Sequence, residues 1–170
     1  MIRLIAVIVA MALPASLPAL PSGSHLTVDG WGPVRIGMSR AQVERALHSK
    51  LEGEPLDDEE SCIEMKPTGR DDGMWFMFEG FKLTRISITE PSKVATPRGV
   101  GIGSSAEEVR TAYRKGLKVE PHYYEDLPSE YLTFWTKPGE RGVRFETNSK
   151  RQVQTIHAGT ESIEYVEGCA

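Results

Sequence analysis

The segment Ile36-Gly-Met-Ser-Arg-Ala-Gln-Val43 recurs further along the chain as Ile102-Gly-Ser-Ser-Ala-Glu-Glu-Val109. The offset between the two copies is constant, since Gly37 aligns with Gly103 and Val43 aligns with Val109. A register that holds in this way indicates an internal repeat rather than a chance similarity. The sequence therefore predicts one structural unit written twice.

Each copy carries the signature of a helix start. Ser39 with Gln42, and Ser105 with Glu108, form Ser-x-x-Gln/Glu capping boxes, in which each partner satisfies an otherwise unpaired backbone amide. Apolar residues then follow at the spacing of one helix face: Val43, Ala46 and Leu47 in the first copy, and Val109, Ala112 and Tyr113 in the second. Two short amphipathic helices are predicted.

Three strand-like runs follow each predicted helix. They lie at 62–66, 74–79 and 81–89 in the first copy, and at 131–136, 142–147 and 152–158 in the second. We therefore predict an α+β fold of two tandem units, each a helix followed by a three-stranded antiparallel sheet. The first unit covers 23–92, and the second, with a C-terminal tail, covers 93–170.

One face of such a sheet has no helix to cover it, because a single short helix can cover only one side of three strands. The alternation of inward and outward residues places large side chains on the uncovered face. The candidate binding residues there are Trp75, Met77, Tyr131, Trp135 and Arg144. We expect a partner to bind on this open aromatic face.

The N-terminus has the pattern of a secretory signal, predicted to cover 1–22. Arg3 precedes the uncharged apolar run from Leu4 to Leu13, which is too short to span a membrane. A stretch rich in proline and small residues follows, so cleavage is expected between positions 15 and 24. The mature chain is then expected to be periplasmic or secreted, with no stable membrane span. The formal charge of −4 over the whole sequence argues against nucleic-acid binding.

Cys62 and Cys169 are the two cysteines of the chain, and both lie in the part predicted to be exported. An even number of cysteines in an oxidising compartment predicts a disulfide. This bridge would close a loop of about 100 residues and stabilise the fold by about 4 to 5 kcal/mol. The alternative, a catalytic thiol, would require a nearby histidine and a reducing compartment.

Sequence motifs for catalysis, metals or cofactors are weak. The four histidines lack metal-ligand spacing, and the run from Gly99 to Ser105 is interpreted as a structural turn rather than a phosphate loop. The acidic run 57–60 is interpreted as a solvated loop. We expect no cofactor, no metal and no enzymatic activity. A small-ligand or enzymatic site around Arg144, Glu146 and His157 is the alternative.

The segment from His122 to Tyr131 combines aromatic and acidic residues. Tyr123 and Tyr124 are its candidate binding residues, because tyrosine offers a large contact area at a low cost in rotamer entropy. The alternative is that one of these tyrosines packs beneath its own loop.

The tandem Ile-Gly-Met/Ser-Ser-x-x-x-Val signature resembles the beta-lactamase inhibitor protein and the outer-membrane assembly lipoproteins of the SmpA/OmlA type. The resemblance implies that the two sheets join into one curved sheet with helices on one face, and that partners bind on the concave side. The chain lacks the lipobox cysteine of the lipoproteins and the within-repeat disulfides of the inhibitor.

These observations favour an exported, non-enzymatic protein-binding module of the cell envelope, with hydrolase inhibition as one form of that function. Its partner would be an unidentified envelope or extracellular protein. A structural role in envelope assembly is the other alternative kept open.

Overall fold

The computed structural model describes residues 24–53 and 61–169. The predicted signal segment 1–22 and the acidic run 57–60 lie outside the described residues.

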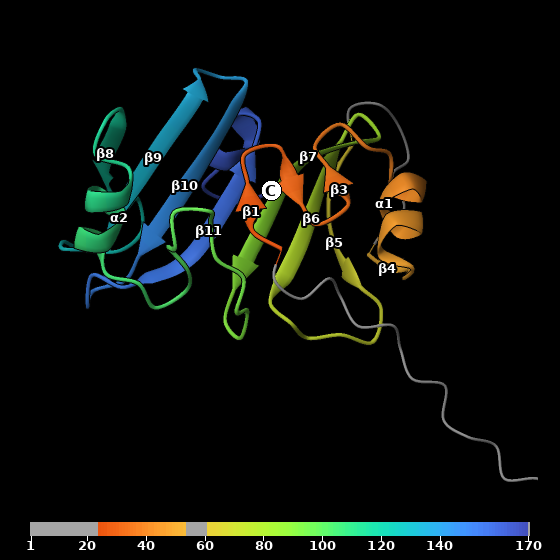
Figure 1. Cartoon of the computed structure of the whole chain (residues 1–170), viewed down its shortest axis with the longest axis horizontal. Coiled ribbons are helices and arrows are strands. Elements are labelled where there is room, and N and C mark those ends of the chain that lie inside the picture. The colour runs from red at the N-terminus through yellow and green to blue at the C-terminus, as the bar shows by residue number, and fades with distance from the viewer. Residues whose placement is uncertain (1–23, 54–60, 170) are drawn as a thin grey trace, which may run out of the picture.

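An eight-stranded antiparallel sheet forms the centre of the molecule (Figure 1). Its strand order is β4-β5-β6-β7-β11-β10-β9-β8, so the first half of the chain supplies one half of the sheet. The strands are β4 (Leu51–Glu52), β5 (Cys62–Pro67), β6 (Met74–Glu79), β7 (Lys82–Thr89), β8 (Leu117–Pro121), β9 (Glu130–Lys137), β10 (Arg141–Thr147) and β11 (Val153–Gly159). The two halves meet where β7 pairs with β11.

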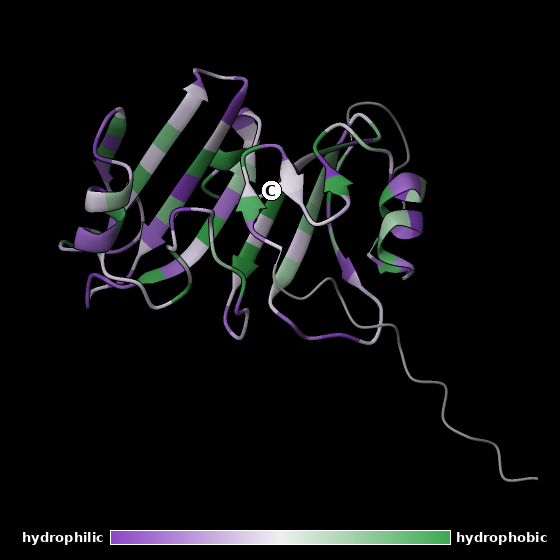
Figure 2. Ribbon diagram, viewed as in Figure 1, coloured by the Kyte–Doolittle hydropathy of each residue, from purple (hydrophilic) through white to green (hydrophobic). Residues whose placement is uncertain are grey.

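Both helices and a small second sheet cover one face of this sheet. The second sheet consists of β1 (Leu26–Thr27), β2 (Gly30–Trp31) and β3 (Val34–Arg35), and it lies over the middle of the molecule (Figure 1). Helices α1 (Arg40–Leu47) and α2 (Ala106–Ala112) lie toward the two ends. The core between these layers includes Trp31, Phe76 and Phe145. Figure 2 shows the alternation of apolar and polar residues along the strands that produces this one-sided core.

The predicted fold class is wrong. The described chain is mostly β, with α-helices of only 8 and 7 residues, and it forms an eight-stranded and a three-stranded sheet rather than two units of a helix and three strands. Each half also contains a fourth strand, β4 or β8, directly after its helix. β4 has two residues, and β8 ends in Pro121 and alternates apolar with charged residues. Such short, charged, proline-containing strands lie at sheet edges, and their sequence signal is weak.

The internal repeat is visible as the same pair of backbone hydrogen bonds in both copies, which joins each helix start to the sheet. In the first copy, the amide of Gly37 donates to the carbonyl of Leu83 at 2.7 Å, and the Leu83 amide donates to Met38 at 2.8 Å. In the second copy, Gly103 and Ser104 exchange the same two bonds with Val153. Both glycines have a positive φ, 91° and 86°, which side-chain-bearing residues rarely adopt. The glycine run before α2 is therefore a structural turn.

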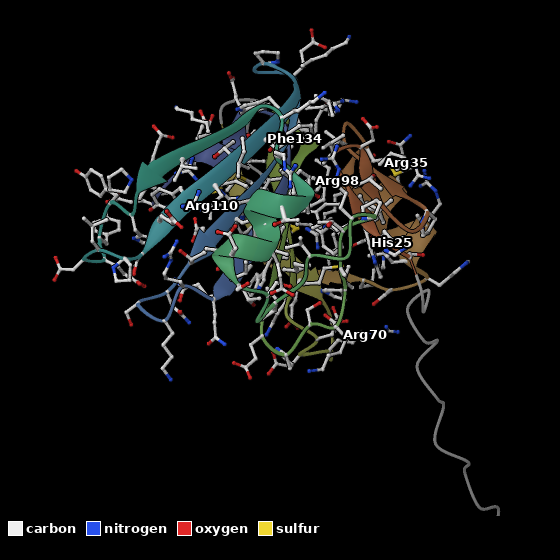
Figure 3. The ribbon with its side chains drawn as sticks, turned by 60° about the vertical axis from the view of Figure 1, so that its left-hand side comes forward. His25, Arg35, Arg70, Arg98, Arg110 and Phe134 are labelled. Carbon is white, nitrogen blue, oxygen red and sulfur yellow. A yellow bond between two sulfur atoms is a disulfide. The ribbon has the colours of Figure 1, made fainter. Side chains whose placement is uncertain are left out.

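At the α2 end, a cation–π cluster fixes the segment that leads into the helix. The Arg98 guanidinium lies 4.4 Å from the centre of the Tyr113 ring and 4.8 Å from that of Phe134 (Figure 3). The same side chain donates to the carbonyl of Ala112 at 2.7 Å, at the helix end. Arg98 therefore contacts both the end of α2 and the sheet, and it joins the two.

Both predicted capping boxes are confirmed. The Ser39 side chain accepts from the amide of Gln42, whose own side chain accepts from the Ser39 amide, and Ser105 and Glu108 repeat the arrangement. These reciprocal bonds satisfy two backbone amides that the first helical turn would leave unpaired.

We expect Ser39→Ala and Ser105→Ala each to lower the free energy of unfolding by about 1 kcal/mol, because each removes a helix N-cap. Equilibrium unfolding in urea would measure the change. Ser39→Thr and Ser105→Thr, which keep a capping hydroxyl, are the matched controls. A loss as large in the threonine variants as in the alanine variants would show that the hydroxyl is not what stabilises the helices.

Candidate functional site

The sheet face opposite the helices, here called the outer face, carries cross-strand rows of side chains. One row runs through Glu64, Met77, Arg85, Gly159, Gly142 and Trp135, which oppose one another on six successive strands. A second row runs through Trp75, Ser87, His157, Arg144, Thr133 and Lys118. Gly159 and Gly142 lie side by side in the first row, and the missing side chain of Gly142 leaves a hollow at the centre of the face.

The C-terminal segment 160–169, here called the strap, fills this hollow. It contains the 3₁₀ helix η1 (Glu161–Glu164), which contacts β7, β10 and β11. Ile163 is fully buried, and a Cβ on Gly142 would lie only 2.8 Å from its Cδ1 atom and 2.6 Å from Cε3 of Trp135. Gly142 is therefore required for this close approach of the strap to the sheet.

Arg85 and the disulfide hold the strap in place. The Arg85 guanidinium donates to the carbonyls of Ser162 (2.9 Å) and Tyr165 (3.3 Å) and to the Glu64 carboxylate (2.6 Å). The Cys62–Cys169 bond then ties the end of the strap to β5, and it confirms the predicted disulfide. A disulfide between distant segments is typical of exported proteins, and it supports an oxidising compartment for this chain.

The strap covers part of the sheet face that the sequence predicts to be open, so several of the predicted binding residues are buried. Met77, Tyr131 and Arg144 are buried, and Trp135 is half-buried beside Gly142 and the strap. Trp75 is also half-buried, with the ammonium group of Lys66 5.6 Å from its ring centre. The structure places these residues together on the outer face, but the strap covers the centre of that face.

A hydrogen-bonded chain of three polar side chains crosses the middle of the outer face. Ser87 Oγ lies 2.7 Å from His157 Nδ1, and His157 Nε2 lies 3.3 Å from a carboxylate oxygen of Glu146. Burial lowers the pKa of His157, although its hydrogen bond to Glu146 opposes this effect. Burial would raise the pKa of Glu146, but the contacts with His157 and Arg144 outweigh it and leave that pKa lowered. A neutral His157 with its proton on Nε2 would donate to Glu146 and accept at Nδ1 from the Ser87 hydroxyl.

This order of serine, imidazole and carboxylate also occurs in hydrolases, but the surroundings differ. Ser87 is buried, and it lies on β7 between two paired strands, with Trp75 opposite on β6 and His157 opposite on β11. Its neighbouring backbone amides belong to these ladders and do not converge on a point beside the hydroxyl. An oxyanion site requires such free donors. The chain of bonds links three central strands, β7, β11 and β10.

The loop between β8 and β9, residues 122–129, is here called the aromatic loop. Its ends are joined by a bond from the His122 amide to the Ser129 carbonyl, and His122 Nδ1 accepts from the amides of Tyr124 and Glu125. The Glu125 carboxylate accepts from Ser129 and from Gln154 on β11. The His122 ring stacks on buried Tyr131, with the ring centres 4.5 Å apart. The base of the loop is thereby fixed to the sheet.

The tip of the aromatic loop projects apolar surface into solvent. Tyr123, Tyr124 and Leu127 are 73%, 60% and 76% exposed, and the two tyrosine rings pack edge to face with centres 4.8 Å apart. The Tyr124 hydroxyl donates to Glu167 of the strap. Two further exposed residues of the strap, Tyr165 and Val166, directly precede Glu167 in the sequence. The tyrosines therefore do not pack beneath their loop.

One groove lies elsewhere, at the rim of the molecule. It has a volume of about 950 Å³ and is lined by residues that include Asp29, Glu79, Lys137 and Arg141. None of the predicted binding residues lines it. Among the residues that the structure describes, no cluster of metal-binding side chains occurs, and no helix is long and apolar enough to cross a membrane.

No protein-family model and no curated protein matches this sequence. Among solved structures, the chain is similar to an extracellular protein containing a SCP domain from Bacillus anthracis str. Ames. The TM-score is 0.50 at 9% sequence identity, over 89% of this chain and 50% of that protein. The chain thus spans half the length of this neighbour. At this identity the similarity concerns the fold alone, and it does not bear on the resemblance to inhibitor and assembly proteins.

Sequence reasoning missed two parts of the outer face. The strap was treated as a tail, although the apolar Ile163 between polar residues was a signal for a buried anchor. Ser87 was also overlooked, because it is one polar residue within the strand-like run 81–89 and its partner His157 lies 70 residues away. Cross-strand pairing of β7 with β11 brings the two together, and the sequence alone does not show which strands pair.

Proposed function

We propose that this chain is an exported, non-enzymatic protein-binding module that recognises its target through the tip of the aromatic loop. The observation that carries the proposal is the exposure of Tyr123, Tyr124 and Leu127 on a loop whose base is fixed. Exposed aromatic side chains gathered at one site are the residues that dominate protein interfaces. Singly exposed apolar residues are ordinary, whereas a cluster of three requires an explanation.

The rigid base favours binding because it lowers the entropy lost on association. His122 and Glu125 hold the loop through side-chain bonds to its own backbone and to β11. The two tyrosine rings also support each other edge to face. A loop that is ordered before binding loses less conformational freedom when its target arrives.

The chemistry of the tip indicates the kind of target surface that it fits. Exposed Asp126 and the strap residue Glu167 place negative charge beside the tyrosines. A complementary surface would combine an apolar pocket for an aromatic ring with basic residues at its rim. Inhibition of an envelope or extracellular hydrolase is the form of this function that the family resemblance favours.

We expect Tyr124→Ala to weaken target binding by about 30-fold, which corresponds to a loss of about 2 kcal/mol for an aromatic hot spot. Affinity capture from envelope extract with the mature chain as bait would first identify the target, and titration calorimetry would then measure the dissociation constant. If the target is a hydrolase, its activity would be assayed with and without the chain.

Phe81→Ala is the matched control, since Phe81 is an exposed aromatic residue in the turn between β6 and β7, away from the loop. This control should bind like the wild type. The proposal fails if a Tyr123→Ala/Tyr124→Ala double variant, folded by circular dichroism, retains wild-type affinity for every captured protein.

A further inference from the structure

The free edge of the eight-stranded sheet at β8 is self-complementary. β8 pairs with β9 on one side, and no described strand pairs with its other side (Figures 1 and 3). We propose that two copies of this chain pair their β8 strands antiparallel about Val119, which joins two sheets into one. This dimer is separate from target recognition by the aromatic loop, and it would stand if that proposal failed.

The direction of the backbone groups on β8 follows from its pairing with β9. One position beyond the last pair of the ladder, Pro121 with Glu130, the His122 amide donates to the Ser129 carbonyl at 3.1 Å, so the backbone of His122 faces the β9 side. Hydrogen-bonded pairs alternate along an antiparallel ladder, so Lys118 and Glu120 also turn their backbone groups toward β9. Leu117, Val119 and Pro121 therefore turn theirs outward. Pro121 fits this position, because its missing amide is not needed by β9.

An antiparallel pair centred on Val119 makes four backbone hydrogen bonds. Val119 would exchange two bonds with Val119 of the second copy, as directly opposed residues do. Leu117 would donate its amide to the Pro121 carbonyl of the second copy, and the symmetric bond would form as well. An ideal ladder would have two more bonds, from residue 121 of each copy to the Leu117 carbonyl of the other. Pro121 has no amide to make them, so the paired segment is short.

The side chains of β8 match in the same register. Lys118 falls opposite Glu120 of the second copy, and Glu120 falls opposite its Lys118, so each charge meets its opposite. Within one copy these residues already form an ion pair, with 2.9 Å between Lys118 Nζ and Glu120 Oε1. The dimer would extend it to a network of four alternating charges, whereas a shift of two residues, which keeps the outward backbone groups facing each other, would set Lys118 opposite Lys118 or Glu120 opposite Glu120.

The exposure of the central residue of β8 agrees with this arrangement. Val119 is 42% exposed although it is an apolar residue within a strand, and the second Val119 would cover it. Arg114 and Lys115 are exposed just before β8.

The first experiment removes the central backbone bonds. Sedimentation equilibrium of the mature chain should show a monomer–dimer equilibrium, and Val119→Pro should weaken the dimer at least about tenfold, because two of its four ladder bonds lose their donors. Proline is tolerated here, since the Val119 amide points away from β9. Val119→Thr keeps the amide and is the matched control. A wild-type chain that stays monomeric at about 100 μM, or a Val119→Pro dimer as stable as wild type, overturns the proposal.

The second experiment tests the register by charge. Lys118→Glu sets carboxylates opposite carboxylates in its own dimer, and Glu120→Lys sets ammonium groups opposite ammonium groups. Each variant alone should therefore dimerise about tenfold more weakly than wild type. A mixture of the two variants restores opposite charges in every pair. With one variant ¹⁵N-labelled, native mass spectrometry should find mostly the mixed dimer. A statistical mixture of the three dimers would refute the proposed register.

Discussion

Replacing both Cys62 and Cys169 by serine should lower the free energy of unfolding by about 4 to 5 kcal/mol, the largest single loss that the structure predicts. The two cysteines are 107 residues apart in sequence. Cross-linking a loop of this length restricts the unfolded chain strongly, and the stabilisation grows with the logarithm of the loop length. Equilibrium unfolding in guanidinium chloride, followed by tryptophan fluorescence, would measure the loss.

Wild-type protein unfolded with excess reductant is the control for this experiment, because it lacks the bond but keeps both cysteine side chains. Its midpoint should coincide with that of the Cys62→Ser/Cys169→Ser variant. A loss below about 1 kcal/mol in both samples would contradict the chain-entropy argument and show that the strap is held by its other contacts.

The sequence was most informative where local chemistry determines the structure. The Ser39 and Ser105 capping boxes depend on residues three positions apart, and both form as expected. The disulfide required only that two cysteines share an oxidising compartment. Because such features depend on a few neighbouring residues or on composition, they can be recognised without knowledge of the fold.

The fold class and the covered centre of the outer face depend on contacts between distant residues. Gly142, which leaves room for Ile163, carries no signal in the sequence, and only strand pairing places it at the centre of the outer face. The two-residue strand β4 likewise exists only because β5 pairs with it. Strand alternation identified which residues share the outer face but could not show that the C-terminus crosses it.

The exposure of the aromatic loop, on which its proposed role rests, depends on local chain geometry. The exposed tip depends on local turns around His122 and Ser129, and its tyrosines project from the sheet margin rather than from the row that the strap covers. Trp135, by contrast, lies in that row, so its truncation would change strap packing together with any contact to a target. Binding experiments on the loop are therefore easier to interpret than experiments on the sheet face.

Arg85→Met is expected to lower the free energy of unfolding by about 3 kcal/mol. Arg85 is only 3% exposed, and its removal would leave the strap carbonyls of Ser162 and Tyr165 without a donor and Glu64 without its cation. Methionine approximates the aliphatic part of the side chain, which separates the loss of polar contacts from the loss of packing. Urea unfolding of the oxidised proteins would measure the change.

Two comparisons establish what Arg85 stabilises. Glu64→Gln should cost only about 1 kcal/mol, because the glutamine still accepts a hydrogen bond and the Glu64 side chain is 35% exposed. Adding Arg85→Met to the Cys62→Ser/Cys169→Ser variant should cost less than it does in the oxidised wild type, because a strap that is no longer tied at its end already pairs more weakly with Arg85. Additive losses would instead mean that Arg85 acts within the sheet, through Glu64 and β5, and that the disulfide alone keeps the strap on the outer face.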